Sequence, residues 1–342
     1  MATNLQPPES LATGVGALPH TDPVRACDDV IGIFARFPYV PTLPNRSLKE
    51  SIVFCDSPRV PGAEIRDNKL LVGKERDLMP EMEQVYLDYL ELNYREYGID
   101  SEYGSGFAEM QRRDLSGART LKCQITGPVT FGMQVTDTNR RPIYYDEQFA
   151  DLLPKISALR ALWCEKEMLK IPGISETLVV LNEPYLAALG SSVIPIQIES
   201  VRAGWEDISS VLDGGLGIHC CSNTDWKFIF SLKPAFLSFD AFTCAKEFLL
   251  YMDSLADFME SGGVVAWGIV PADYTVFSVQ SEDGLFEQYQ EIRRRVTEHV
   301  DPVIFDAQSM ITPTCGIRFS DEQGSREIMR CAYRISGRIR GE

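Results

Sequence analysis

Continuous apolar runs bounded by turn residues recur along this chain, and they predict strands that are buried on both faces. Seven runs have this character: "LATGVGAL" (11–18), "LKCQITG" (121–127), "TLVVLN" (177–182), "GLGIHC" (215–220), "AFLSFDAF" (235–242), "GVVAWGIV" (263–270) and "FDAQSMITP" (305–313). Runs without alternation are typical of parallel sheets, because helices cover both faces of such sheets. A further strand is predicted within "FPYVPTLP" (37–44).

The longer segments between these runs carry apolar residues at intervals of three and four, which is typical of amphipathic helices. The clearest examples are 78–97, 146–170, 246–260, 285–299 and 321–338. Alternation of strand and helix predicts parallel crossover units. Seven or eight units over this length favour a closed (β/α)₈ TIM barrel over an open doubly wound sheet.

Residues 44–79 are rich in Pro, Arg and Asp and follow neither period, so we expect a long inserted excursion over one end of the barrel. A chain of 342 residues exceeds the usual size of a single core, although barrels often reach this length as one domain. We therefore expect residues 1–342 to form one barrel domain, with two domains as the alternative.

Composition narrows the classes of partner. The net charge of −16 and the single dense basic run, Arg293 to Arg295, argue against nucleic-acid binding, which needs clustered cations. No apolar run approaches the roughly 20 residues that span a bilayer, so no membrane partner is expected. The start "MATNLQPPES" lacks the features of a secretory signal, and we expect a cytoplasmic protein.

Nine cysteines are an odd number without framework spacing, in a chain large enough to fold without disulfides. We expect most of them to be small buried apolar residues. This group comprises Cys27, Cys123, Cys164, Cys244 and Cys331. A disulfide between the adjacent Cys220 and Cys221 is not expected in a reducing compartment.

Strand ends are where the chemistry of a barrel is expected, because the loops after the strands build its active face. The runs end in "GALPHTD", "TGPVTFG", "NEPY", "HCCSNTDW", "FDAF" and "TPTCG". Polar and metal-binding side chains therefore concentrate at the predicted active face.

His219 and Cys221 stand one residue apart, and an extended backbone points both side chains the same way while Cys220 points away. Zinc prefers imidazole nitrogen and thiolate sulfur, so these two residues are candidate ligands. Cys315 is a candidate third ligand if its strand lies nearby, and Asp240 a candidate fourth. Such a set leaves an exchangeable position, unlike a closed structural site. The alternative is a histidine that is merely hydrogen-bonded at a strand end.

Asn182 and Glu183 end a buried strand, where a carboxylate is costly unless it is partnered or faces a cavity. A functional role is predicted, with a surface salt bridge as the alternative. His20 has two interpretations: it orients a substrate, or it caps the helix that begins near Asp22, where Thr21 or Asp22 is the obvious N-cap.

Together the strand-end motifs "VGALPHTD", "TGPVTFG", "NEP", "HCC", "FD" and "TCG", over roughly residues 12–330, resemble the catalytic half of cobalamin-independent methionine synthase. That barrel superfamily also includes uroporphyrinogen decarboxylase and methylcobamide:thiol methyltransferases. The resemblance implies a (β/α)₈ barrel with a Zn²⁺ ion that binds a thiol for methylation. His219 and Cys221 match the family's H-x-C ligands, Cys315 matches its "CG" cysteine, and Asp240 falls where methionine synthases have a ligand glutamate.

The same resemblance implies a substrate pocket, in which His20 and Glu183 are also catalytic candidates. Its expected lining is Gly16, Ala17, His20, Asn182 and Glu183. Two positions depart from the methionine synthases: Ala17 stands where they commonly have serine, and Asn182 where an aspartate holds the substrate amino group. A neutral amide is a weaker partner for an ammonium than a carboxylate is, so an acceptor thiol other than homocysteine is a second possibility.

A tryptophan that helps to hold folate has no counterpart after "GPVT", and the family's N-terminal barrel is not part of these 342 residues. A methylated corrinoid protein is therefore expected as methyl donor at least as much as methyltetrahydrofolate. The leading hypothesis is a zinc-dependent thiol S-methyltransferase. The alternatives are a metal-free decarboxylase like uroporphyrinogen decarboxylase, which needs a basic cleft where the first motif offers only Arg25, and a non-catalytic corrinoid- or thiol-binding protein.

Overall fold

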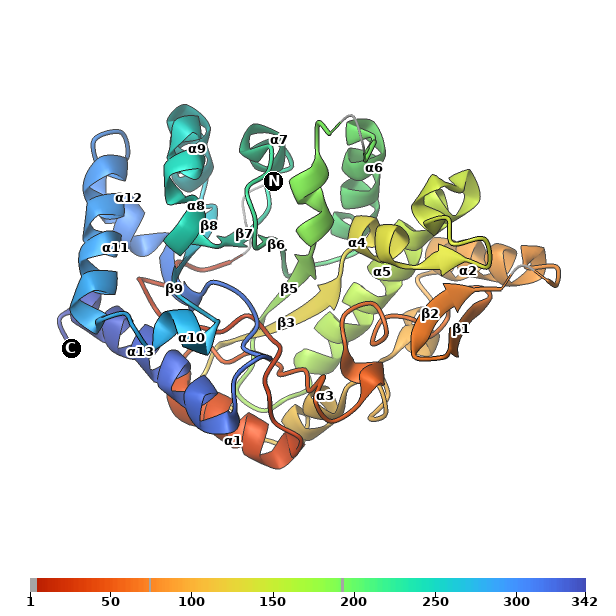
Figure 1. Ribbon diagram of the computed structural model, residues 1–342, viewed down its shortest axis with the longest axis horizontal. Helices are drawn as coiled ribbons and strands as arrows, with labels where there is room; N and C mark the ends of the chain where they lie inside the picture. The colour runs from red at the N-terminus through yellow and green to blue at the C-terminus, as the bar shows by residue number, and fades with distance from the viewer. Residues whose placement is uncertain (1–4, 74, 192–193) are drawn as a thin grey trace.

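The computed structural model describes residues 5–73, 75–191 and 194–342, and a curled sheet of six parallel strands forms its centre (Figure 1). The strand order is β3-β5-β6-β7-β8-β9. The bounds are β3 Thr120–Thr126, β5 Glu176–Asn182, β6 Gly215–Cys220, β7 Phe236–Phe239, β8 Val264–Val270 and β9 Ser309–Pro313. Nearly every strand residue is buried, as continuous apolar runs predict.

Two predicted strands are longer in the sequence than in the structure. β7 ends at Phe239 because Asp240 already caps the next helix, and its side chain accepts a hydrogen bond from the backbone N–H of Thr243. The last strand begins at Ser309, since the preceding residues of the run form helix α12, Pro302–Ala307.

The first two predicted strands, 11–18 and 37–44, pair only through single parallel bridges. Ala12 is bridged to Ile311 of β9, Ala17 to Thr42, and Tyr39 to Lys122 of β3. Prolines at 38, 41 and 44 lack the N–H that a continuous ladder needs. The result is a six-stranded sheet whose edges are linked by two bridged segments, rather than the eight full ladders that the sequence predicted.

Helices surround this sheet, as Figure 1 shows. They are α1 Pro23–Ile33, α2 Met79–Glu91, α3 Ser105–Met110, α4 Pro128–Gln134, α5 Glu147–Met168, α6 Ile198–Ser209, α7 Trp226–Ser231, α8 Ala241–Phe248, α9 Met252–Glu260, α10 Tyr274–Phe277, α11 Glu282–Val296, α12 and α13 Glu322–Arg340. Short 3₁₀ turns occur at Leu48–Glu50, Tyr94–Tyr97, Ile143–Tyr145, Pro184–Ala188 and Leu249–Tyr251. The helices predicted at 146–170, 285–299 and 321–338 are confirmed within a few residues. The segment 78–97 is helical to Glu91 and ends in a separate 3₁₀ turn, and 246–260 is divided between the end of α8, a 3₁₀ turn and α9. No helix of the described residues is long and apolar enough to cross a bilayer.

The excursion at 44–79 has two parts. Its second half forms a hairpin, β1 Ala63–Arg66 and β2 Lys69–Val72, which pairs with the short β4, Thr136–Asp137, in a separate sheet. Its first half runs past the carboxyl end of β3, where Asp56 accepts a 2.7 Å hydrogen bond from the backbone N–H of Thr126. Arg160 of α5 holds the other Asp56 oxygen at 3.3 Å, in a buried ion pair. This pairing fixes the excursion against the sheet.

Lys122 is a charged residue inside the sheet. Its side chain is 2% exposed, its Nζ donates to Gln124 Oε1 over 2.8 Å, and it lies 5.3 Å from the centre of the Tyr39 ring. None of the described residues provides an acidic partner for it within 4.0 Å. Burial lowers the pKa of Lys122 to about 7.

We predict that Lys122→Met removes a component of the pH dependence of stability. The folded pKa of about 7 lies below the ordinary 10.5. Between these values the unfolded chain binds more protons, so the free energy of unfolding rises with pH. Urea titrations of both proteins at pH 7 to 10 should show the wild type gaining on the order of a few kcal/mol relative to the variant. Parallel pH curves would contradict this account.

Candidate metal and thiol site

A cavity of about 470 Å³ opens at the carboxyl ends of the central strands. Parallel strands end on the same side, so residues from β3, β5, β6 and the loop after β9 meet in this one space. The 44–79 excursion adds a wall through Glu50, Ile52 and Cys55. A cavity of this size suits a small-molecule ligand.

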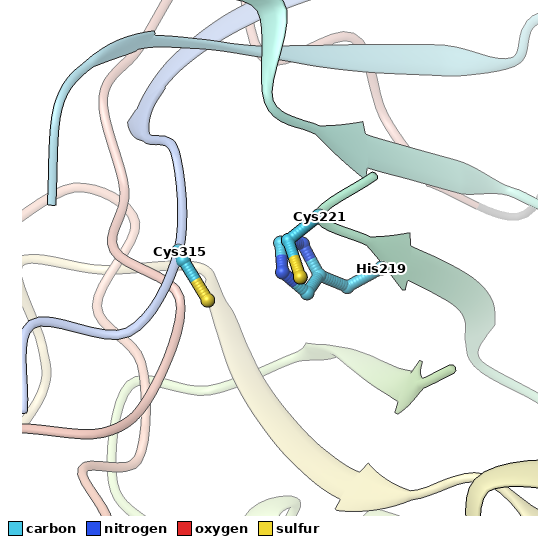
Figure 2. A group of neighbouring side chains, drawn as sticks. All are labelled: His219, Cys221 and Cys315. Carbon is cyan, nitrogen blue, oxygen red and sulfur yellow. The ribbon is translucent and has the colours of Figure 1, made fainter. Parts of the chain in front are cut away.

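His219, Cys221 and Cys315 come together in this cavity, as the sequence predicted. One ligand atom from each side chain lies within 4.8 Å of the other two. Figure 2 shows the Cys315 sulfur pointing from the loop after β9 towards His219 and Cys221, which come from the end of β6. A nitrogen and two sulfurs are the donors that zinc prefers, and no other group of His, Cys, Asp and Glu among the described residues has this geometry.

The His219 ring is oriented by a neighbour on the next strand. Its Nδ1 lies 2.7 Å from Ser238 Oγ, and the two residues are paired in register between β6 and β7. Its Nε2 is buried without a hydrogen-bond partner among the described residues. A proton on Nδ1, donated to the serine, leaves the Nε2 lone pair directed at the cysteines, as a metal ligand requires.

The two thiols of the cluster interact directly. A hydrogen bond from Cys315, together with the adjacent His219 ring, lowers the pKa of Cys221. The same interaction, with burial, raises the pKa of Cys315. Cys221 is therefore the more acidic of the two thiols, and a metal that bound both sulfurs would displace the proton from Cys315. The residues present thus fit a zinc ion.

Cys220 does not join this cluster. It is fully buried in the apolar core, where burial raises its pKa to about 12. The prediction that it points away from the candidate site is confirmed.

Asp240, the predicted fourth ligand, lies outside the group of three. Its carboxylate caps α8, accepting hydrogen bonds from the backbone N–H and the hydroxyl of Thr243 at 2.9 and 2.6 Å. Burial raises the pKa of Asp240, and the charge of Cys221 adds to that rise, so the two residues are electrostatic neighbours. The cap explains why the side chain is held away from the metal-binding atoms.

Three residues of the predicted substrate pocket line the cavity: Gly16, Ala17 and Asn182. Gly16 has φ of +148°, which favours glycine. Ala17 accepts a 2.8 Å hydrogen bond from the N–H of Ile317, and a Cβ at Gly316 would come within 2.8 Å of the Ala17 Cβ. The first-strand motif is thereby joined closely to the loop that carries Cys315.

Glu183 does not line this cavity, although the sequence suggested a substrate-binding and catalytic role. It is buried, and its oxygens accept hydrogen bonds from the N–H groups of Val129 and Thr130 and from the Thr130 hydroxyl, at 3.0, 2.8 and 2.7 Å. These groups form the start of α4. Gly127 is required there, since a Cβ would lie 2.1 Å from the carboxylate. Burial raises the pKa of Glu183 to about 7.

His20 also lies outside the cavity lining. It is fully buried, with its Nε2 2.8 Å from Asp29 of α1, and Asp29 in turn pairs with Arg326 of α13 at 3.1 Å. The cap of α1 is Asp22, which accepts from the N–H of Val24. The position of His20 therefore indicates a role in joining two helices.

Sequence reasoning missed Ser238, Gln124 and Arg318. The serine orients His219, and the other two line the cavity. Ser238 and Gln124 interrupt the apolar runs "AFLSFDAF" and "LKCQITG". A polar side chain inside a buried strand needs a partner, and that signal could have found both. Arg318 stands in no such run.

Comparisons with known proteins bear on the fold. No protein-family model and no curated protein matches the chain. The crystal structure of the putative vitamin-B12 independent methionine synthase from Listeria monocytogenes matches with a TM-score of 0.53 at 13% identity, covering 94% of this chain and 87% of that one. That likeness supports a methionine synthase-like α/β fold and, at this identity, nothing finer.

A second structure, a B12-independent methionine synthase from Shewanella sp. W3-18-1 in complex with selenomethionine, matches with a TM-score of 0.47 at 15% identity. The match covers 65% of this chain and 62% of that one, so this chain spans less than two thirds of its length.

We predict that Glu183→Gln destabilises the protein without affecting metal binding. Glutamine has one acceptor oxygen, and its NH₂ group must face N–H or O–H donors at the start of α4. The expected loss is about 1–3 kcal/mol in the free energy of unfolding. Urea unfolding and metal titration of the same samples measure both quantities. If the variant bound metal more weakly but unfolded with the same free energy, Glu183 would have a role in the metal site and this interpretation would be wrong.

Proposed function

We propose that this protein is a zinc-dependent thiol S-methyltransferase of methionine-synthase type. In this proposal a methyl group passes from a methylated corrinoid protein or methyltetrahydrofolate to a small thiol, homocysteine or another. The observation that carries it is the convergence of His219, Cys221 and Cys315 within 4.8 Å, in a cavity at the strand ends. The methionine synthase-like fold agrees with it.

We also infer that the two bridged segments complete a (β/α)₈ barrel, in one domain covering residues 1–342. The bridges run in the required order, from β9 to segment 11–18, then to segment 37–44, then to β3. All three are parallel, as a closed barrel of this type requires. A barrel would hold the strand ends at fixed spacing around the cavity.

Three protein ligands would leave a coordination position open for the substrate. A zinc ion bound there would supply Lewis acidity that lowers the pKa of a thiol substrate towards neutrality. Cys221 and Cys315 would hold the ion as thiolates, and His219 would hold it as a neutral imidazole oriented by Ser238. The cavity walls would position the substrate sulfur next to the methyl group. During transfer the thiol proton leaves to solvent, the S–CH₃ bond forms and the bond from donor to methyl breaks.

The alternatives draw less support from the cavity. A decarboxylase acting on a polycarboxylate needs several cations, whereas Arg318 is the one arginine or lysine that lines this cavity within the described chain. A non-catalytic thiol- or corrinoid-binding protein would keep the same ligands, so only turnover separates it from an enzyme. All nine cysteines are free, which is compatible with the cytoplasmic location that we propose.

We predict one zinc ion per chain, bound by the three side chains. Cys221→Ser and Cys315→Ser should lose stoichiometric zinc, because each removes a thiolate ligand. Ser238→Ala should weaken zinc binding by roughly 10–100-fold, since it frees the ring that carries the ligand nitrogen. The control is Cys244→Ser, a half-buried cysteine outside the cluster, which should bind zinc like the wild type. Elemental analysis and competition with a chromophoric chelator provide the readouts.

Turnover tests the enzymatic part of the proposal. Zinc-loaded wild type should methylate a small thiol with methylcobalamin, as a corrinoid donor, or with methyltetrahydrofolate, and Cys221→Ser should not. Zinc binding without turnover of either donor would favour the non-catalytic alternative. A wild-type chain that binds no zinc would refute the metal site itself.

A further inference from the structure

Beside the cavity, three polar side chains form a chain of hydrogen bonds that crosses from β3 to β5, and two of them, Gln124 and Asn182, line the cavity. Lys122 Nζ donates to Gln124 Oε1 over 2.8 Å, and Gln124 Nε2 donates to Asn182 Oδ1. Lys122 and Gln124 are buried, and Asn182 is half-buried at the cavity wall. We call these three residues the amide relay.

The hydrogen bond of its first member sets the direction of the relay. Lys122 Nζ donates to Gln124 Oε1, so the carbonyl oxygen of Gln124 is the atom that faces the lysine. Gln124 then turns its NH₂ group to the next residue, where only the carbonyl oxygen of Asn182 can accept. Asn182 is left with its own NH₂ group as the free end. Each amide is oriented by the one before it.

That free end is a hydrogen-bond donor at the wall of the candidate site. Asn182 Nδ2 donates to none of the described residues, and Asn182 is paired in register with His219 on the neighbouring strand. A substrate held at His219 and the two cysteines therefore meets an N–H donor on this side.

The charged side chains that line the cavity favour an anionic ligand, as the Asn182 N–H donor does. Arg318 lines it and has no ion-pair partner among the described residues. The two carboxylates that line it are already engaged: Glu50 accepts from Arg46 and Ser105, both at 2.7 Å, and Asp273 caps α10. An anionic group entering the cavity finds a donor and a cation, whereas an ammonium finds no free carboxylate.

We propose that the acceptor thiol carries an anionic hydrogen-bond acceptor, with a carboxylate as the simplest case, that binds to Asn182 and Arg318, and that an amino group is not recognised. This rests on the proposed function and specifies its substrate class as acidic thiols rather than amino-acid thiols. Gln124 and Lys122 are positioning residues, which act by setting the orientation of the Asn182 amide.

Calorimetric titration of the zinc-loaded protein with four thiols tests this. The ligands are 3-mercaptopropionate, which has a carboxylate, cysteamine, which has an ammonium, homocysteine, which has both, and 4-mercaptobutyrate, which is homocysteine without the amino group. We expect 3-mercaptopropionate to bind at least roughly tenfold more tightly than cysteamine, because charge-assisted hydrogen bonds are about twice as strong as neutral ones. Removing the amino group of homocysteine should not weaken binding, as judged with 4-mercaptobutyrate.

Gln124→Glu reverses the relay by replacing one NH₂ group with oxygen. One carboxylate oxygen would face Lys122 and the other Asn182, whose amide must then rotate to donate to it. The Asn182 carbonyl oxygen would turn to the cavity, and the preference between 3-mercaptopropionate and cysteamine should shift towards cysteamine by roughly tenfold or more. Asn182→Asp, which presents an acceptor directly, should cause a shift of the same sign.

Gln134→Glu is the matched control. Gln134 lines the same cavity but takes no part in the amide relay, so the same change of charge there should leave the order of the affinities unchanged. Thermal melts and zinc stoichiometry establish that each variant is folded and loaded.

The outcomes separate the two proposals. Wild type that binds zinc and prefers cysteamine, or that shows no shift in either relay variant, overturns the acidic-thiol inference and leaves the methyltransferase standing. Wild type that binds zinc but no thiol overturns both. If Gln134→Glu changed the preference between 3-mercaptopropionate and cysteamine by the same factor, the added charge alone would explain the effect. The proposed role of the amide relay would then be wrong.

Discussion

Backbone pairing between parallel strands is the constraint on which the candidate site depends. Asn182 is in register with Thr126 on one side and with His219 on the other, and His219 is in register with Ser238. Parallel strands must end on the same side, so Thr126, Asn182 and His219 of this row line one cavity, with Ser238 behind His219. A slip of one residue in β6 would turn His219 into the apolar layer and place Cys220 in the cavity. The register of the parallel strands thus sets both the positions of the candidate metal ligands and the hydrogen-bonding groups at the cavity wall.

Carboxylates at the same strand ends also have a structural role, which competes with metal or substrate binding. Each strand of the parallel sheet is followed by a helix or a 3₁₀ turn whose first N–H groups have no partner within it, and an acidic side chain at that point can satisfy them. Asp240 caps α8 in this way, and Glu183 reaches across to the start of α4. A carboxylate at a strand end is therefore not evidence of catalysis by itself. The cysteines, which make poor caps, are the more specific signal.

This competition explains which parts of the sequence prediction succeeded. Periodicity located the strands and helices. Strands that are buried on both faces appear as continuous apolar runs, whereas helices that are buried on one face have apolar residues at intervals of three and four. The grouping of His219, Cys221 and Cys315 was predicted because soft ligands at strand ends are rare. The roles given to His20 and Glu183 required knowledge of where their partners lie: Asp29 is close in sequence, but Thr130 is 53 residues from Glu183. Such pairings follow from strand order and helix placement, which local patterns do not contain.

The buried Lys122 remains unusual as a matter of energetics. Burial without a counter-ion disfavours its charged form, and a methionine would fill the same space without that penalty. An apolar residue, however, could not orient Gln124, whose amide would then present either end to Asn182. In a low-dielectric interior the difference between a donor and an acceptor is large, because the wrong end leaves a buried group unpaired. The cost in stability is therefore consistent with a requirement for a cavity wall of defined polarity, set by a lysine that does not itself line the cavity.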